Sequence, residues 1–435
     1  MEQIATARAS DLDSAFRITR RRLIPFLLLM YILSFLDRAN IGFAKQAFQA
    51  SVGVSDAAYA LGAGLFFVTY AALEVPSNLI MHRVGARLWM ARIMVTWGLI
   101  SAATMFVKGE ISFYAVRLLL GAAEAGFFPG VILYLTYWFT DRSRGQVMGL
   151  FYFGAPLAFI FGGPLSGLLL EFHGLAGLEG WQWMFMVEGL LASIVGVWAF
   201  FYLDDKPADA RWLPPAEKQA LTAAIAQEDR SKQAQGHASF KLIATNPRVL
   251  HFIAIYFLIQ MSVYGVIFYL PTQVAALLGK KVGLEVGLVS AIPWACALVA
   301  AFALPRLADQ QGSHRPLAVA CLAVSGLGIA LSAGSGPGLA LLALCFAAAG
   351  FIAVQPLFWT FPTNYLGGVA AAGGIALINA LGALGGFVAP NVKALADASF
   401  GSSQAGLYTL ACTTLIGAAL ILGLRRAEPV ATVIS

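Results

Sequence analysis

The sequence predicts an all-α, polytopic membrane protein with twelve transmembrane helices in two six-helix bundles. Apolar residues make up 59% of the 435 residues and charged residues only 11%, too few charges to cover the surface of a soluble protein of this length. Apolar segments of about 20 residues, the length of a membrane-spanning helix, recur along the whole chain. Lipid admits only helices and closed barrels, and the alternation that marks barrel strands is absent.

The twelve apolar segments follow one another in two groups of six. The first six predicted helices span 23–44, 58–81, 89–107, 111–139, 147–170 and 183–203. The other six span 249–270, 283–304, 317–333, 339–361, 370–391 and 404–424. The predicted domains are therefore a cytoplasmic N-terminal tail (1–22), an N-terminal bundle (23–203), a cytoplasmic linker (204–248), a C-terminal bundle (249–424) and a cytoplasmic C-terminal tail (425–435). In the linker, the helix-favouring run Ala216–Arg230 predicts a short surface helix.

The distribution of Lys and Arg predicts the orientation. The outer loops hold five of these residues: Lys45, Lys108, Lys280, Lys281 and Lys393. Arg38 and Arg117 lie within predicted helices, which leaves 21 of the 28 on the other side. The basic side is normally cytoplasmic, so we expect both termini to be cytoplasmic. This excess also explains the net charge of +6 without a nucleic-acid partner.

Two pairs of charged residues interrupt the apolar segments. Asp37 and Arg38 are adjacent in the first predicted helix, and Arg117 and Glu124 lie in the fourth. At about 1.5 Å per residue, Arg38 lies about 22 Å from the inner end of its helix and Arg117 about 9 Å from the outer end of its own. In a hydrocarbon core of about 30 Å these depths are similar. Glu124 shares nearly one helix face with Arg117, about 10 Å deeper. The four groups can therefore share one site.

Two interpretations of these four groups are open. As buried salt bridges they would hold helices together, but such pairs add little stability over apolar packing. Charges at membrane depth are more often functional. Two ionised carboxylates neutralise two guanidinium groups, and a proton on one carboxylate would free a guanidinium to bind a substrate carboxylate. The residues favour this second interpretation.

Catalytic and metal-binding patterns are absent from the sequence. The cysteines and histidines have no ligand spacing, and there is no HExxH motif, nucleophile elbow or phosphate-binding loop. The sequence therefore predicts a protein that is not an enzyme and that needs no metal or other cofactor.

Several short motifs resemble those of a known family. They are Asp37-Arg38-Ala39-Asn40-Ile41, Glu74-Val75-Pro76-Ser77-Asn78, Arg117 with Glu124, and Gly180-Trp181-Gln182-Trp183. The loop His82-Arg83-Val84-Gly85-Ala86-Arg87 is similar to a degenerate form of the signature of the major facilitator superfamily, with His82 in place of the usual acid. Together they resemble the anion:cation symporter branch, the carriers of galactonate, tartrate, phthalate and hydroxyphenylacetate. The stretch Phe268–Thr272 and the pair Gly386-Phe387 look closer to the tartrate, phthalate and hydroxyphenylacetate carriers.

This resemblance implies roles for individual residues. Arg38 and Arg117 would bind the substrate carboxylate, and Asp37 and Glu124 would carry protons. By the same resemblance Tyr70, Trp359 and Asn379 look like substrate contacts. Read alone, each of these three is as well explained by packing or by a hydrogen bond between helices.

Other polar residues in the apolar segments suggest further roles. Tyr264 is a candidate substrate contact on a helix face that it shares with Gln260. Glu74, nearer the cytoplasmic end of its helix, suggests a gating or structural role. Glu188 and Glu285 lie near outer helix ends and suggest surface residues. Prolines on both sides of Trp359, Pro356 and Pro362, suggest a broken helix that exposes backbone to a cavity.

The sequence therefore predicts a secondary active transporter that imports a small organic anion by proton symport with alternating access. The substrate would be a tartrate-like dicarboxylate, an aromatic acid or a sugar acid, and sodium in place of protons remains an alternative. A cation-exporting antiporter and a non-transporting membrane sensor are the rival functions. The predicted partners are the substrate, protons driven by their gradient, and the lipid bilayer. We expect a monomer in the bacterial inner membrane.

Overall fold

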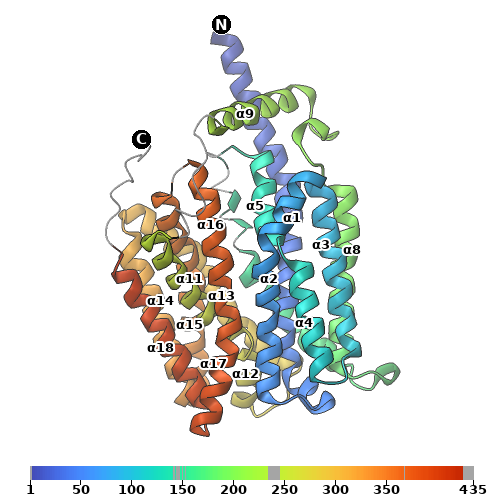
Figure 1. Cartoon of the computed structure of the whole chain (residues 1–435), viewed down its shortest axis with the longest axis vertical. Helices are drawn as coiled ribbons and strands as arrows, with labels where there is room; N and C mark the ends of the chain where they lie inside the picture. Colours follow the sequence, from blue (N-terminus) through green and yellow to red (C-terminus); the bar gives the residue numbers. More distant parts are fainter. Residues whose placement is uncertain are drawn as a thin grey trace.

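The computed structural model describes residues 2–140, 143, 147–148, 150–151, 153–233, 245–366 and 368–424. Within these ranges all regular secondary structure is helical, and the helices stand side by side along the long axis of the molecule (Figure 1). The start of α1 and the linker helix α9 lie at one end, which we call the α9 face. We call the other end the far face.

The first half of the chain forms one bundle. Its helices are α1 (Glu2–Val52), α2 (Asp56–Val84), α3 (Ala86–Ala103), α4 (Glu110–Glu124), α5 (Phe127–Trp138), α7 (Gly154–Leu170) and α8 (Gly180–Tyr202). Short 3-10 turns, η1 (Thr104–Phe106) and η2 (Leu175–Gly177), lie between them. The unbroken α1 continues well beyond the predicted span 23–44, and its Ser14 donates to Glu217 of α9 at 3.3 Å.

The second half of the chain forms the other bundle. The linker carries η3 (Pro207–Asp209) and α9 (Pro215–Gln233), which contains the expected surface helix. The bundle helices are α11 (Pro247–Ile267), α12 (Leu270–Leu278), α13 (Leu284–Gln311), α14 (His314–Gly334), α15 (Pro337–Tyr365), α16 (Gly368–Ala383), α17 (Gly385–Phe400) and α18 (Ser403–Leu422).

The number of membrane-spanning segments agrees with the sequence prediction. The described residues contain 11 helices long and apolar enough to cross a membrane, and the shorter apolar helix α7 supplies the twelfth segment. The fold class is therefore confirmed: an all-α protein of twelve spanning segments in two bundles.

The fourth and eleventh predicted spans are interrupted rather than continuous. The fourth breaks between α4 and α5, and the eleventh breaks between α16 and α17. The break expected around Trp359 is wrong, because α15 runs without interruption past Pro356 and Pro362. A transmembrane helix tolerates proline when neighbouring helices support the freed backbone groups.

The break between α4 and α5 depends on Gly126. Its φ of 85° and ψ of 1° lie in the left-handed region that favours glycine. A Cβ there would lie 2.3 Å from Oγ of Ser77 on α2, so no other side chain fits. The break directly follows Glu124, the last residue of α4, and so ends that helix at the charged site.

We predict that Gly126→Ala destabilises the protein, since it adds a left-handed backbone cost of about 1–2 kcal/mol to the overlap with Ser77. Gly109→Ala is the matched control, because Gly109 has extended backbone (φ 172°) and a Cβ added to it would have no other atom within 4 Å. Thermal unfolding of both purified variants checks this. Equal unfolding midpoints for the two variants would contradict it.

The two bundles approach each other through backbone at the far face. A Cβ on Gly163 of α7 would lie 2.9 Å from the carbonyl oxygen of Gly287 on α13, and a Cβ on Gly287 would lie 2.2 Å from that of Gly163. A Cβ on Gly167 would lie 2.4 Å from the carbonyl oxygen of Gly283. Only glycine permits this closeness, so the far face is closed by direct contact between the bundles.

Candidate functional site

Arg38 lies at the centre of the charged site. Its Nε and Nη2 groups donate to Oε1 of Glu124 on α4 at 2.8 and 2.6 Å. Ser34, one turn earlier on α1, donates to the same oxygen at 2.6 Å. The Nη1 group donates to the hydroxyl of Tyr264 on α11 at 2.9 Å. Arg38 therefore links the two bundles, and Tyr264 is the contact on the second one.

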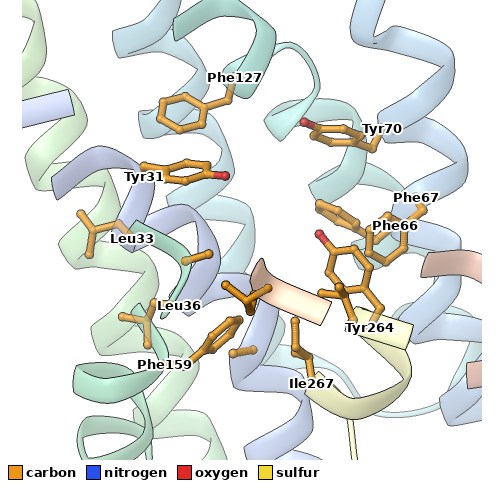
Figure 2. Packing of buried hydrophobic residues seen from close by; sticks show 14 of the residues in the cluster. Tyr31, Leu33, Leu36, Phe66, Phe67, Tyr70, Phe127, Phe159, Tyr264 and Ile267 are labelled. Carbon is orange, nitrogen blue, oxygen red and sulfur yellow. The ribbon is translucent and has the colours of Figure 1, made fainter. Parts of the chain in front are cut away.

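Aromatic rings surround the Arg38 guanidinium. Its Cζ lies 4.9 Å from the ring centre of Tyr70, 5.3 Å from that of Phe35 and 5.4 Å from that of Phe66. Figure 2 shows Phe66 and Phe67 on α2 beside Tyr264 of the other bundle, with Tyr70 above them. Each cation–π contact contributes about 0.5–2 kcal/mol. The rings hold the guanidinium away from lipid without neutralising its charge.

Asp37 belongs to a second polar cluster, which it forms with Asn40 and Ser101. Its Oδ1 accepts hydrogen bonds from Ser101 of α3 and from the amide of Asn40, the latter at 3.2 Å. The side chain is 3% exposed. Arg117 acts on Asp37 electrostatically, although no ion pair joins them within 4 Å.

Arg117 is buried without a carboxylate in contact. It donates to the backbone carbonyls of Gly62 at 3.4 Å and Ala63 at 3.2 Å, and its Cζ lies 5.2 Å from the ring centre of Phe66. Among the described residues, no carboxylate oxygen lies within 4 Å of it. The structure thus brings all four predicted charges into one region but joins only Arg38 and Glu124 directly.

Each of the two acids keeps one oxygen open. Oδ2 of Asp37 and Oε2 of Glu124 are buried, and neither has a hydrogen-bond partner among the described residues. The opposite oxygen of each carboxylate accepts two or more hydrogen bonds. A proton on the open oxygen would leave those hydrogen bonds in place while removing the negative charge.

A second link between the bundles lies toward the α9 face. The amide of Asn379 on α16 donates to Oε1 of Glu74 on α2 at 2.7 Å, and Glu74 is 1% exposed. The hydroxyl of Tyr256 on α11 donates to the side-chain oxygen Oδ1 of Asn379 at 3.5 Å. Asn379, expected as a substrate contact, therefore contacts Glu74 and Tyr256 in this structure.

Two other candidates, Trp359 and Gln260, lie on α15 and α11 of the second bundle. The ring of Trp359 on α15 packs 4.9 Å from that of Tyr256, and its Nε1 is buried with no partner among the described residues. Gln260, one turn before Tyr264 on α11, also has an open oxygen, Oε1. The expected shared face of Gln260 and Tyr264 is buried in the interior of the protein.

Glu188 was expected at the surface, and this expectation is wrong. The side chain is 2% exposed and accepts a hydrogen bond from Ser166 of α7 at 2.7 Å. The helix α8 begins at Gly180, earlier than the predicted start at 183, so Glu188 lies more than two turns inside it. Glu285 is exposed and pairs with Lys280, as expected.

Lys393 was assigned to an outer loop, and that assignment is also wrong. It lies inside α17, which continues to Phe400, and it is 7% exposed. Its ammonium pairs with Asp397 at 2.6 Å and lies 4.3 Å from the ring centre of Tyr269. The predicted end of this span at 391 was about two turns too early.

A cavity of about 490 Å³ lies between the bundles on the α9 side of Arg38. Its lining includes Tyr31 and Phe35 of α1, Gln355 of α15, and two basic residues, Arg20 and Arg306. Phe35 also lies beside the Arg38 guanidinium, so this ring stands between the cavity and the charged site.

Comparisons with known proteins agree with this architecture. The family model of the Major Facilitator Superfamily matches residues 27–390. The chain is 51% identical over 414 residues to the inner membrane transport protein RhmT of Escherichia coli, covering 95% of this chain and 96% of that one. It is 41% identical to a protein named "Putative tartrate transporter" from Agrobacterium vitis, covering 97% and 93%. The solved xylose transporter XylE of E. coli has the same fold, with a TM-score of 0.74 at 14% identity over 93% of this chain and 97% of that one.

Proposed function

Because the chain belongs to the Major Facilitator Superfamily and is a membrane transporter rather than an enzyme, we propose that it imports a small organic anion together with protons. The observation that carries this proposal is the Arg38–Glu124 ion pair, which is buried between the bundles and hydrogen-bonded to Tyr264. We place the α9 face in the cytoplasm, because the Lys and Arg excess lies on that side. We place the protein in the bacterial inner membrane, because its relative RhmT is named an inner membrane transport protein of E. coli.

Arg38 is the primary anion-binding group. With Glu124 ionised, three of its contacts are taken by one carboxylate and one hydroxyl. A substrate carboxylate that replaced Glu124 would receive two parallel N–H donors, the bidentate geometry that arginine provides. Arg117, for which the described part of the chain provides no carboxylate within 4 Å, supplies the second positive charge that a dicarboxylate would use.

Protons on Glu124 and Asp37 make the site ready for an anion. The open Oε2 of Glu124 accepts a proton, the attraction to Arg38 weakens, and the site gains one positive charge. Binding of the anion restores neutrality. Proton and anion therefore bind together, because either one alone would leave an uncompensated charge in this low-dielectric site.

Alternating access requires the links between bundles to break and re-form. The hydrogen bonds Arg38–Tyr264 and Asn379–Glu74 both join the two bundles. A substrate that takes the Arg38 donors removes the first link directly. Tyr70, Trp359 and Asn379 would contact the part of the substrate that lies beyond its carboxylate.

Uptake into proteoliposomes that contain only this protein tests the proposal. We expect labelled tartrate, an aromatic acid or a sugar acid to accumulate when the outside is acidified, without sodium. One proton per substrate and a gradient of one pH unit would give about tenfold accumulation. Efflux stimulated by external acid would instead indicate an antiporter, and no movement of any organic anion would contradict the proposal. A thermal-stability screen of organic acids on the purified protein selects the substrates to label.

A further inference from the structure

We propose that Glu188 is a third proton-binding carboxyl group of the transport site, coupled to Asp37 through the amide of Asn40. This inference rests on the proposed proton-coupled function. It assigns a role to a buried acid that neither the ion pair at Arg38 nor the substrate site uses.

Glu188 is buried without any counter-charge in contact. It is 2% exposed, Ser166 donates to its Oε1 at 2.7 Å, and its Oε2 has no partner among the described residues. Among these residues, no Lys, Arg or His nitrogen lies within 4 Å of it. A lone carboxylate in so apolar a place is costly, whereas the protonated acid is a neutral hydrogen-bond donor. Glu188 therefore holds a proton in this conformation.

We place the acceptor for that proton on Asn40. The Asn40 side chain lies beside the Glu188 carboxyl group, and its buried Oδ1 has no hydrogen-bond partner among the described residues. A hydrogen bond from protonated Oε2 of Glu188 to Oδ1 of Asn40 would satisfy both open atoms at once. The same amide donates through Nδ2 to Asp37 at 3.2 Å.

The amide of Asn40 can therefore hydrogen-bond to Glu188 and Asp37 at once when one of these acids is protonated and the other is ionised. When Glu188 is protonated, the amide oxygen faces Glu188 and the NH2 group stabilises ionised Asp37. When Glu188 loses its proton, its carboxylate needs the NH2 group, which then leaves Asp37 and favours protonation there. The two acids therefore titrate as a coupled pair, in which loss of the proton from one favours proton binding at the other.

The surrounding helices leave Asp37 as the charge that acts on Glu188. The helices α1, α3 and α7 pack against α8, together with the 3-10 turn η1, which has no charged residue. Helix α7 has no titratable residue, and α3 has only Arg87 and Arg92, near its end at the α9 face. On α1, Asp37 acts on Glu188 directly, whereas Arg38 pairs with Glu124 and Lys45 with Asp56.

Along the helix axes, Glu188 lies nearer to the far face than Asp37 does. Asn40 follows Asp37 by about one turn of α1 toward the far face, and Ser166 lies about one turn from the end of α7 there. Protons that arrive from this side reach Glu188 before Asp37. This placement suits a group that loads protons ahead of the substrate.

Infrared difference spectra with Glu188→Gln test the proton itself. The glutamine side chain can donate to Asn40 as the protonated acid does, so the variant should fold normally. We expect wild-type protein to show the carbonyl band of a buried protonated carboxyl group, and this band to be absent in Glu188→Gln and present in the control Glu285→Gln. Asp37→Asn should shift the titration of Glu188, and this shift should be smaller when Asn40→Leu is present in both proteins compared, because the part of the coupling that the amide carries is lost. A spectrum unchanged by Glu188→Gln would overturn the proposal.

Transport stoichiometry is the second readout. Balancing a substrate gradient against a pH gradient gives the number of protons per substrate. We expect this number to fall by one in Glu188→Gln, which lowers accumulation about tenfold at a gradient of one pH unit, while substrate exchange continues. An unchanged number would overturn a role in the cycle. If wild-type transport proves independent of protons, the proposed function fails, and the infrared result still decides whether Glu188 exchanges protons with Asp37.

Discussion

Arg38→Lys is expected to abolish substrate binding while leaving a folded protein. Lysine keeps the positive charge beside Glu124 but cannot offer two parallel donors to a substrate and a third to Tyr264. The loss of charge-assisted hydrogen bonds should cost about 3 kcal/mol, or roughly a 100-fold loss of substrate affinity. Ligand-induced thermal stabilisation and exchange in proteoliposomes both measure this loss.

Arg92→Lys is the control for this prediction. Arg92 stacks on Trp89 at 3.8 Å and is one of the α3 residues nearer the α9 face, away from the charged site. The Arg92→Lys variant should bind substrate with the affinity of the wild type. Arg38→Ala would in addition leave Glu124 buried without its partner, at a stability cost of about 3–5 kcal/mol unless Glu124 is protonated. Wild-type affinity in Arg38→Lys would remove Arg38 from the substrate site.

Glu124→Gln and Asp37→Asn are expected to separate exchange from uphill transport. Each amide imitates the protonated acid, and in Glu124→Gln the Arg38 guanidinium is therefore free to bind the anion at any pH. Exchange of labelled for unlabelled substrate should therefore persist, whereas accumulation driven by a pH gradient should disappear. In Glu124→Gln the affinity for substrate should also lose its dependence on pH, since the group that competes for Arg38 no longer ionises.

Counterflow and gradient-driven uptake in the same vesicles measure the two activities. Glu110→Gln, at the exposed start of α4, is the matched control and should retain both. Full pH-driven accumulation in both site variants would show that protons are carried elsewhere. Loss of exchange in both, with substrate binding intact, would show that the acids serve the conformational change instead.

The depth of the charged residues could be predicted from the sequence, whereas their pairing could not. Counting helical rise placed Arg38 and Arg117 at similar depths, and the structure has them in one region. Which arginine pairs with which acid depends on how each helix is rotated about its axis. In segments that are apolar all round, periodicity does not reveal that rotation. Ser34 was missed for this reason, although its position four residues before Arg38 puts both on one face.

Glu188 shows the same limit more sharply. Its sequence position near a helix end suggested water, but its helix begins earlier and turns the side chain toward the interior. A usable signal was present: Gly189, Ser193 and Gly196 form a small-residue face that packs on α3 around Gly98. That face shows which side of α8 is buried. Glu188 is adjacent to it.

The break between α4 and α5 illustrates a further limit. Proline is the obvious breaker in a sequence, yet α15 continues through two prolines. The α4–α5 break instead depends on Gly126, where space and backbone angle together exclude a side chain. Space at a glycine depends on the neighbouring helix, so it becomes visible only in three dimensions.

A single methyl group added at the glycine contacts of the far face would force the two bundles apart there. Because the Gly163 and Gly287 backbones nearly touch, an added Cβ on either one penalises only the conformation in which they meet. A conformation with that face open pays no such penalty. The equilibrium between the two conformations of the carrier therefore depends on the lack of a side chain at Gly163 and Gly287. Alanine at either position offers a way to trap the conformation with the far face open, which this structure does not show.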